Sequence, residues 1–494
     1  MGQGASGGDG LLYRRDKLLT SPEGNQARHR SGGAVIVLAA AVVLHLCFLI
    51  SLSTGFLNPI FVEANEGPRQ AGDFFGIYQA GANLAHGYSI YDSDDYRAEA
   101  PRTVPYFYFY RYLPPTAFVA ALGANVLSPW PAYWTWVVLC ELILFAIVIS
   151  VLRQREWPLA RRLVAAALWL GAFPFYLEQL MGQFSIVMAA FLWMLWRWEA
   201  KTTAGMSAAD PTDGCSGSVL ARFLEILRAW RTYRWRQDVF DRAPFFLGWV
   251  GSLSLKTFSA LLAFPYLRDR KLKRLIVGAG ATLILSVPYY LARPGDLHEF
   301  VRLNFTPFTP SLHKGSFSLH NLIRDLLSRI EVPALHVLHP VGPLQLNALG
   351  VVVLLAGAAI AGLALVATIR LYNHPNRTAL DLGLWTTAFF LVFKSIWEYH
   401  FVMLLPAVTA LWLTTGSRTI LAAGVLLAFP TIYALAPTLA GVSAKAPIEQ
   451  WPAWFAALHL SVKAVPTLVL FGWCVREAGR GLGSRVAPSP GPAG

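Results

Sequence analysis

The residues of this sequence that could take part in chemistry lie in short polar clusters between long apolar stretches. Asp73 follows Gly72 and opens a weakly amphipathic stretch. A carboxylate held there could act as a general base that takes a proton from a hydroxyl group. The alternative interpretation is a helix N-cap, a position that aspartate favours, and the two roles are compatible.

Ionisable side chains within apolar runs form a second group of candidates. Lys256 and Lys394 both stand in such runs, where a charge costs ~2.5 kcal/mol or more and usually faces a cavity or a partner. Lys394 lies close to the end of its run and could instead snorkel to the interface. Glu141 is equally explained by a polar contact between helices. Lys256 is therefore the strongest functional candidate of the three.

Histidines and a nearby lysine form a third group, at His313, Lys314 and His320, and a polar turn follows at Trp397–His400. Two histidines seven residues apart favour structural or solvated side chains over metal ligands. The four cysteines define no disulfide or metal framework. The motifs HExxH and CxxC are absent from the sequence, and GxSxG occurs only in the Gly/Ser-rich N-terminal tail, at Gly4–Gly8, so zinc hydrolysis and serine esterase chemistry have no support.

The acidic triplet Asp92, Asp94 and Asp95 matches the DxD pattern in which paired carboxylates hold a divalent ion between phosphates. No Gly-rich phosphate loop or βαβ pattern accompanies it. A solvated acidic turn is the favoured interpretation, and the role of these three residues stays open. The sequence therefore predicts no metal and no cofactor.

Composition indicates the environment in which these residues work. The chain has 494 residues, of which 55% are hydrophobic and only 14% are charged, whereas roughly a quarter of a soluble protein is charged. This excludes a water-soluble globular protein. The net charge of +13 is explained by basic loops beside apolar spans, so nucleic-acid binding is not expected.

Apolar runs near the ~20 residues that a bilayer requires predict an all-α polytopic membrane protein with about 10 to 12 transmembrane helices. The predicted membrane domain covers 34–475, between disordered cytoplasmic tails at 1–33 and 476–494. Basic clusters between the runs place 199–243 in the cytoplasm and 56–130 and 293–346 outside. The individual runs are 34–55, 131–152, 162–180, 184–198, 275–292, 347–370, 380–396, 400–414, 419–438 and 453–475.

The segment 245–266 has basic clusters at both ends, which a single span cannot keep on one side. A hairpin that turns near Lys256 would resolve this, and such backbone is tolerated where it packs in protein or lines a watery cavity. An ordinary single span is the alternative, and charge alone does not decide between them.

The first outer loop is predicted to hold interfacial helices. The aromatic run Tyr106–Tyr110 alternates like a strand, but a lone strand beside a bilayer leaves its edges unpaired, so an interfacial helix is expected. Residues 114–127 are apolar but short, which predicts a helix on or in the outer leaflet.

An ordered series of short motifs resembles the integral-membrane glycosyltransferases of the GT-C fold, and most closely glycosyltransferase family 87, the polyprenol-phosphate-mannose-dependent mannosyltransferases. The resemblance covers roughly residues 34–475. Its motifs are Asp73–Phe74, Tyr78–Ala80, Gly87–Asp92, Tyr110–Pro115, Gly182–Gln183, Leu255–Lys256, Ser395–Phe401 and Leu404–Pro406.

The resemblance implies the roles of individual residues. It assigns the catalytic base to Asp73 and an active-site role to His400, where many members have a double histidine and this chain has Tyr399 and His400. Lys256 is implied to face the lipid phosphate. The remaining expected substrate-binding residues are Tyr78, Arg111, Gln183 and His320.

The expected activity is inverting transfer of a hexose, first of all mannose, from a polyprenyl-phosphate sugar to a lipid or glycan acceptor outside the cytoplasm. The expected location is the bacterial plasma membrane, with both termini cytoplasmic. Two alternatives stay open: transfer of arabinofuranose or glucose from the same type of carrier, and a transporter or lipid flippase, which an inverted internal repeat would favour. Donor sugar, acceptor and oligomeric state are not predicted.

Overall fold

The computed structural model describes most of the chain. The described residues are 22–61, 70–92, 99–106, 109–207, 243–269, 271–305, 315–329, 339–341, 344–346, 348–393, 396–432, 435–443 and 446–480. His313, Lys314, Lys394, Asp94 and Asp95, which the sequence analysis singled out, lie outside them.

Helices account for nearly all of the regular structure. The first half contains α2 (Pro22–Thr54), α3 (Asn58–Phe61), α4 (Gly72–Ala85), α5 (Pro114–Ala124), α6 (Pro129–Leu152), α7 (Leu159–Leu170), α8 (Phe173–Met181) and α9 (Ser185–Ser207). The middle contains α11 (Ala243–Leu255), η1 (Thr257–Leu262), α12 (Ala263–Arg268), α13 (Leu272–Ala292), α14 (Pro294–Phe305) and α15 (Leu319–Ser328). The last part contains α16 (Ala348–Arg370), η3 (Leu371–Asn373), α17 (Arg377–Val392), η4 (Glu398–Leu404), α18 (Leu405–Thr415), α19 (Arg418–Ala428), α20 (Ala436–Leu439), η5 (Ile448–Gln450) and α21 (Ala453–Arg480).

Membrane-compatible helices dominate this set and confirm an all-helical, polytopic membrane architecture. Among the described residues, 6 helical segments are long and apolar enough to cross a bilayer. They are Gly32–Thr54, Pro129–Leu152, Leu159–Met181, Leu272–Ala292, Gly350–Asn373 and Ala453–Arg480. The helices over the other predicted spans are shorter or carry more charge, as in α17, α18 and α19.

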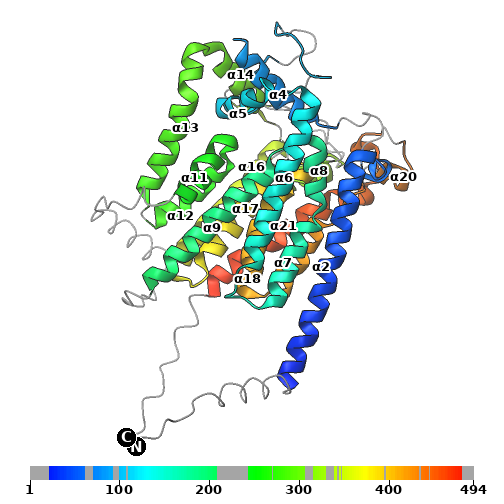
Figure 1. Ribbon diagram of the computed structural model, residues 1–494, viewed down its shortest axis with the longest axis vertical. Helices are drawn as coiled ribbons and strands as arrows, with labels where there is room; N and C mark the ends of the chain where they lie inside the picture. The colour runs from blue at the N-terminus through cyan, green and yellow to red at the C-terminus, as the bar shows by residue number, and fades with distance from the viewer. Residues whose placement is uncertain are drawn as a thin grey trace, which may run out of the picture.

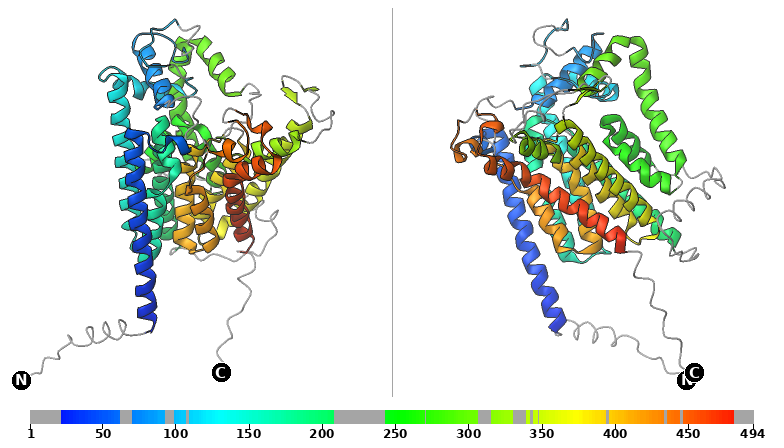
Figure 2. Two further views of the ribbon diagram at one scale, coloured as in Figure 1. Left: turned by 90° about the vertical axis from the view of Figure 1, so that its right-hand side faces the viewer. Right: turned by 180° about the vertical axis from the view of Figure 1, so that it is seen from behind.

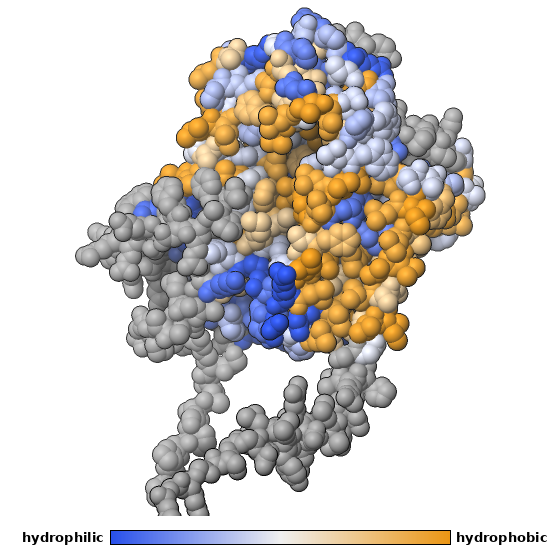
Figure 3. Space-filling view, in the orientation of Figure 1, coloured by the Kyte–Doolittle hydropathy of each residue, from blue (hydrophilic) through white to orange (hydrophobic). Residues whose placement is uncertain are grey.

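The helices form a bundle with a cap at one end (Figure 1). The cap contains α4, α5 and α14, and α2 begins and α21 ends at the opposite end of the molecule (Figures 1 and 2). Large apolar side chains are exposed along α2, α6, α13 and α16, and one flank of the bundle shows broad apolar areas (Figure 3). Such a surface suits a lipid environment.

The segment 245–266 reverses direction, as the hairpin hypothesis predicted. Helix α11 ends at Leu255, and Lys256 has extended backbone before the η1 turn. Ser252 then donates a hydrogen bond to Ser259 across the reversal at 2.9 Å. The ring of Tyr266 returns to within 4.9 Å of the Trp249 ring. Lys256 therefore stands at the apex of a helical hairpin, while the membrane side of its base stays a prediction.

Several helices extend beyond the predicted boundaries of the membrane domain and its loops. Helix α2 begins at Pro22, inside the predicted tail 1–33, and α9 continues to Ser207, past the predicted loop start at 199. Helix α21 likewise runs into the second tail, to Arg480. Hydropathy marks the apolar part of a helix, whereas backbone hydrogen bonding continues into polar residues beyond it.

Two local predictions also need correction. The described part of Tyr106–Tyr110 is not helical. The tyrosine hydroxyls instead tie this stretch to neighbouring backbone: Tyr106 donates to the carbonyl of Gln70, and Tyr110 to that of Leu113 at 2.7 Å. A small antiparallel pair, β1 (His339–Val341) and β2 (Leu344–Leu346), interrupts the otherwise helical fold.

Candidate functional site

Asp73 lies in the first turn of α4, beside a strained start to the helix. The helix N-cap is Ala71, which has a left-handed backbone with φ of 65° and no side-chain cap. Asp73 is therefore not the N-cap, contrary to one interpretation of the sequence. The Ala71 amide donates to the Leu180 carbonyl on α8 at 2.7 Å, which ties the start of α4 to that helix. A non-glycine residue in this conformation costs of order 1–3 kcal/mol, and such strain gathers at functional sites.

The Gly182–Gln183 motif packs directly against this helix start. Gly182 has φ of +71°, and a Cβ there would lie 2.3 Å from Cβ of Phe74. Only glycine satisfies both the backbone conformation and the close approach. The turn delivers Gln183, whose Oε1 accepts a hydrogen bond from the Tyr112 hydroxyl at 3.0 Å. Because Oε1 is occupied, the amide NH₂ of Gln183 is the end that can donate to Asp73.

Asp73 combines an enclosed oxygen with several stabilising neighbours. Its Oδ2 is buried and has no hydrogen-bond partner among the described residues. Burial raises the pKa of the Asp73 carboxyl above its ordinary value, while hydrogen bonding from Gln183, the charge of Lys256, hydrogen bonding from Tyr399 and the charge of Arg111 act in the opposite direction. A carboxylate with a raised pKa is a stronger base than an exposed aspartate.

Lys256 brings a cation to this carboxylate from the hairpin apex. Its Nζ is buried without a hydrogen-bond partner in the described part of the chain, and it lies 4.9 Å from the centre of the Phe184 ring. Both Asp73 and Glu178 act on it electrostatically. A buried ammonium group needs such partners, because desolvation of an isolated charge is costly.

Glu178 is a site residue that the sequence analysis missed. Its side chain is fully buried on α8, and its Oε1 accepts the Ile186 amide at 2.6 Å, which caps the first turn of α9. Its Oε2 has no hydrogen-bond partner among the described residues. The charge of Lys256 acts on Glu178 as it does on Asp73. An acidic residue within the apolar run 162–180 was the available signal.

The Trp397–His400 turn brings two more polar side chains, Tyr399 and His400, into interaction with Asp73 and Lys256. Nδ1 of His400 accepts the Trp397 backbone amide at 3.2 Å, so the neutral ring carries its proton on Nε2. Lys256 lies close enough to His400 to influence it electrostatically. Tyr399 stacks edge-on to His400 at 4.5 Å and is the hydrogen-bonding neighbour of Asp73.

Two further predicted residues have different positions. Arg111 is exposed, packs 6.0 Å from the Phe109 ring and contributes its positive charge to Asp73. Tyr78 is buried, and its hydroxyl donates to the Leu127 carbonyl at 2.7 Å. That bond joins α4 to the loop between α5 and α6, and the substrate-binding role expected of Tyr78 stays a prediction.

His320 belongs to a segment that pairs with the His400 turn. It is the second residue of α15, whose N-cap Ser318 accepts the Asn321 amide. Just before it, the Phe317 amide donates to the Ile396 carbonyl at 2.8 Å. The structure thus gathers Asp73, Gln183, Lys256, Arg111 and His400, with His320 on the adjoining helix.

The DxD motif has a structural contact at its first residue. Asp92 Oδ2 accepts the amides of Glu99 and Ala100, both at 2.9 Å, and so closes the loop between them. No group of three or more His, Cys, Asp or Glu side chains that could hold a metal ion occurs within the described ranges.

Glu141 has the interhelical role that was one interpretation of the sequence. It bonds to His45 of α2 at 3.0 Å and accepts the Gln179 amide of α8. These contacts join three helices within the apolar part of the bundle, which is how polar side chains contribute to packing there.

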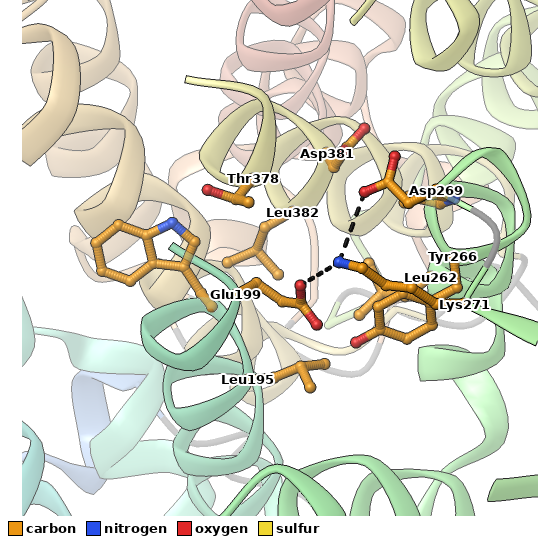
Figure 4. A pocket seen from close by; sticks show the side chains of 11 residues that line it. Leu195, Glu199, Leu262, Tyr266, Asp269, Lys271, Thr378, Asp381 and Leu382 are labelled. Carbon is orange, nitrogen blue, oxygen red and sulfur yellow. Dashed lines mark hydrogen bonds and ion pairs between the residues drawn. The ribbon is translucent and has the colours of Figure 1, made fainter. Parts of the chain in front are cut away.

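A separate charged cluster lies toward the other end of α9. Its member on that helix, Glu199, is about 21 Å from Ser185 along the helix axis, at 1.5 Å per residue. Figure 4 shows Lys271 between Glu199 and Asp269 in a pocket with Tyr266 and Asp381. Arg268 closes the hairpin base through two bonds to Asp381, of 3.0 and 2.7 Å. The carboxylates here are already paired with cations, unlike Oδ2 of Asp73.

The geometry around Asp73 suits one kind of chemistry. A base with a raised pKa and an imidazole N–H donor both lie within the electrostatic influence of one buried cation, Lys256. A base can take a proton from a hydroxyl, while the cation and the N–H donor stabilise negative charge that develops on a leaving group.

Comparisons with known proteins add a distant structural similarity. No protein-family model matches the chain, so the resemblance to glycosyltransferase family 87 stays a prediction. No curated protein matches either. Among solved structures, the chain is similar to the crystal structure of ArnT from Cupriavidus metallidurans bound to undecaprenyl phosphate, with 15% identity and a TM-score of 0.39 over 92% of this chain and 78% of that one.

Proposed function

We propose that this chain is an inverting membrane glycosyltransferase that moves a hexose from a polyprenyl-phosphate sugar to a hydroxyl of a lipid or glycan acceptor. Mannose is the first candidate for the sugar. The proposed location of the reaction is the extracytoplasmic face of a bacterial plasma membrane, with both chain termini in the cytoplasm. Six candidate membrane spans support an integral membrane protein.

The observation that carries the proposal is the Asp73 carboxylate, with one enclosed and unpaired oxygen, next to the Lys256 cation on a hairpin apex. Asp73 provides a base and Lys256 a positive charge. Among the ion pairs of the described residues, none joins these two side chains directly. The acceptor hydroxyl would bond to the unpaired oxygen of Asp73, and the donor phosphate would pair with Lys256.

The proposed reaction gives each of these groups a role. Asp73 takes the proton of the acceptor hydroxyl while the hydroxyl oxygen attacks the anomeric carbon. The bond from that carbon to the phosphate oxygen breaks, and its electron pair leaves with polyprenyl phosphate. Direct displacement inverts the anomeric configuration. Base assistance is worth ~10² to 10⁴ in rate.

The leaving phosphate gains negative charge as the bond breaks. The proposed cationic and N–H groups for it are Lys256, Nε2 of His400 and Arg111, because preorganised donors and charges stabilise such a transition state. Gln183 is proposed to orient Asp73 through its amide, and His320 to contact substrate from α15. A single phosphate without a nucleotide makes no metal obligatory.

The test is a transfer assay with the purified full chain in lipid nanodiscs. Radiolabelled mannose, glucose and arabinofuranose, each on the same polyprenyl phosphate, are incubated with membrane lipid extracts. The proposal expects one labelled product, with mannose as the best donor, and release of polyprenyl phosphate in equal amount. Movement of the intact lipid-linked sugar between leaflets, with no new glycosidic bond, would instead identify a flippase.

A further inference from the structure

A fully buried ion pair includes Glu398, the residue directly before Tyr399 and His400 of the candidate site. Glu398 in η4 and Lys463 in α21 have side chains with 0% exposure, and their charged atoms are 3.2 Å apart. The Thr431 hydroxyl donates to the same Glu398 oxygen, Oε1. A buried ion pair contributes little net stability compared with apolar packing, and its best-documented use is to specify one arrangement.

Lys463 anchors this pair to the end of another helix. Its Nζ donates to the carbonyls of Leu426, Leu427 and Phe429, at the C-terminal end of α19. The Leu426 and Leu427 carbonyls belong to the last turn of α19 and Phe429 is its C-cap, so these carbonyls lack partners within the helix. Lys463 thereby fixes α21 and α19 to one point, at which Glu398 is held.

A second contact from α21 holds the segment that pairs with this turn. His459, one helical turn before Lys463, lies 5.2 Å from the Phe317 ring. Backbone bonding from Phe317 to Ile396 and from Glu398 to Gly315 then joins the segments on either side of the turn. The same helix face therefore supports both sides of the pairing.

Glu398 does not act on the site directly, but its next two neighbours do. Tyr399 packs against the apolar cluster that contains Phe75 and the adjoining Phe74, beside Asp73. His400 follows Tyr399 and has its ring oriented by the Trp397 amide. Any shift of Glu398 moves both side chains, because they share one short 3₁₀ turn.

We propose that the Glu398–Lys463 ion pair, together with Thr431, is a positioning device that holds Tyr399 and His400 against Asp73. In this role the three residues act through Tyr399 and His400 and are not themselves catalytic. The consequence for sugar transfer rests on the proposed function, whereas the consequence for Asp73 itself can be measured without any substrate.

The readout is the protonation of Asp73. The charged and titratable groups that act on it are Lys256 from the hairpin, Tyr399 from η4 and Arg111 from the first outer loop, with Gln183 as a neutral donor. Lys256 in turn interacts electrostatically with Glu178 from α8, and its charge acts on His400. Loss of the Tyr399 hydrogen bond alone raises the Asp73 pKa, because that bond favours the charged carboxylate.

The experiment uses an apolar carbodiimide, which reacts with protonated buried carboxyls, on the purified full chain in nanodiscs. Labelling of the peptide that contains Asp73 is followed against pH by mass spectrometry. Tyr399→Phe should move the midpoint up by about 1 pH unit. Glu398→Gln should move it by the same amount, and the double variant should move it no further than Tyr399→Phe alone.

Two further variants keep the test decisive. Thr431→Val removes one donor to Glu398 without changing charge, and it should shift the midpoint in the same direction by a smaller amount. It replaces Glu398→Gln as the test if that variant does not fold. Glu141→Gln is the matched control, because Glu141 also bonds to neighbouring helices but lies in a different network. Its midpoint should equal that of the wild type.

The outcomes separate the two proposals. Wild-type midpoints in Glu398→Gln and Thr431→Val, or a shift in Glu398→Gln that adds fully to that of Tyr399→Phe, would overturn the positioning role. A wild-type chain that transfers no sugar would overturn the proposed function, while the labelling shifts would still decide whether Glu398 positions Tyr399.

Discussion

Replacement of Gly182 by alanine tests whether the turn after α8 positions the base. The added methyl group would meet Cβ of Phe74, the residue directly after Asp73, at 2.3 Å. Ordinary contacts begin near 3.4 Å, so Phe74 or the turn must shift by about 1 Å. The turn carries Gln183 and the helix start carries Asp73, so the shift changes the distance between them.

The expected effect on turnover is large. A displacement of about 1 Å between catalytic groups can cost 10²-fold in rate, which corresponds to about 2.7 kcal/mol of transition-state stabilisation. Alanine in the left-handed region adds roughly 1–2 kcal/mol of conformational strain. This strain should lower the free energy of unfolding by roughly 1–2 kcal/mol, while turnover falls by about two orders of magnitude.

Gly441→Ala provides a matched control for the strain. Gly441 has φ of +72°, close to the +71° of Gly182, but a Cβ there has nothing within 4 Å. Both variants bear the same backbone cost, and only Gly182→Ala bears the clash. Transfer rates are measured at equal amounts of monodisperse protein, with thermal unfolding of each variant.

The reasoning would be refuted by either of two results. The first is a Gly182→Ala enzyme whose turnover rate is within threefold of the wild type at equal amounts of folded protein. Alternatively, Gly441→Ala could lose as much activity as Gly182→Ala, which would make backbone strain the cause and leave the Phe74 contact without a role.

Three further predictions concern charge, metal and topology. Lys256→Met removes a charge that lowers the Asp73 pKa. The acid limb of the pH–rate profile, where activity falls as pH drops through that pKa, should therefore move to higher pH. An unchanged acid limb would show that Lys256 does not act on Asp73. Asp94→Asn should retain activity, and EDTA should not abolish it; a dead variant rescued by divalent metal would favour a metal-dependent site. Reporter fusions at residues 240 and 272 should both give cytoplasmic signals, since basic residues flank the hairpin; opposite signals would require a single span.

The sequence was sufficient for the elements that depend on apolar length and charge. Apolar runs located the helices at Pro129–Leu152, Leu272–Ala292 and Ala453–Arg480 because a span needs a continuous apolar surface. The basic flanks of 245–266 left a hairpin at Lys256 and a single span both open, and the contact between Trp249 and Tyr266 favours the hairpin. Helix ends were less predictable, since hydrogen bonding continues past the apolar part.

The side-chain partners of the candidate site were beyond reach of sequence pattern. The Tyr78 hydroxyl bonds to Leu127, 49 positions away, and nothing in the local sequence indicates this acceptor. Glu178 and Lys463 did carry a signal, as ionisable residues inside apolar runs. That signal does not say which charge each one meets, because the partner belongs to a different helix.

The measurement that tests the central claim most directly is sugar transfer by Asp73→Asn. Asparagine nearly preserves the size of the side chain and removes only the base, so the folded state and donor binding should be retained. Turnover should fall by at least ~10² to 10⁴, the range that base assistance supplies. At equal membrane abundance, an Asp73→Asn enzyme that still transfers sugar at the wild-type rate would contradict the assignment of Asp73 as the base.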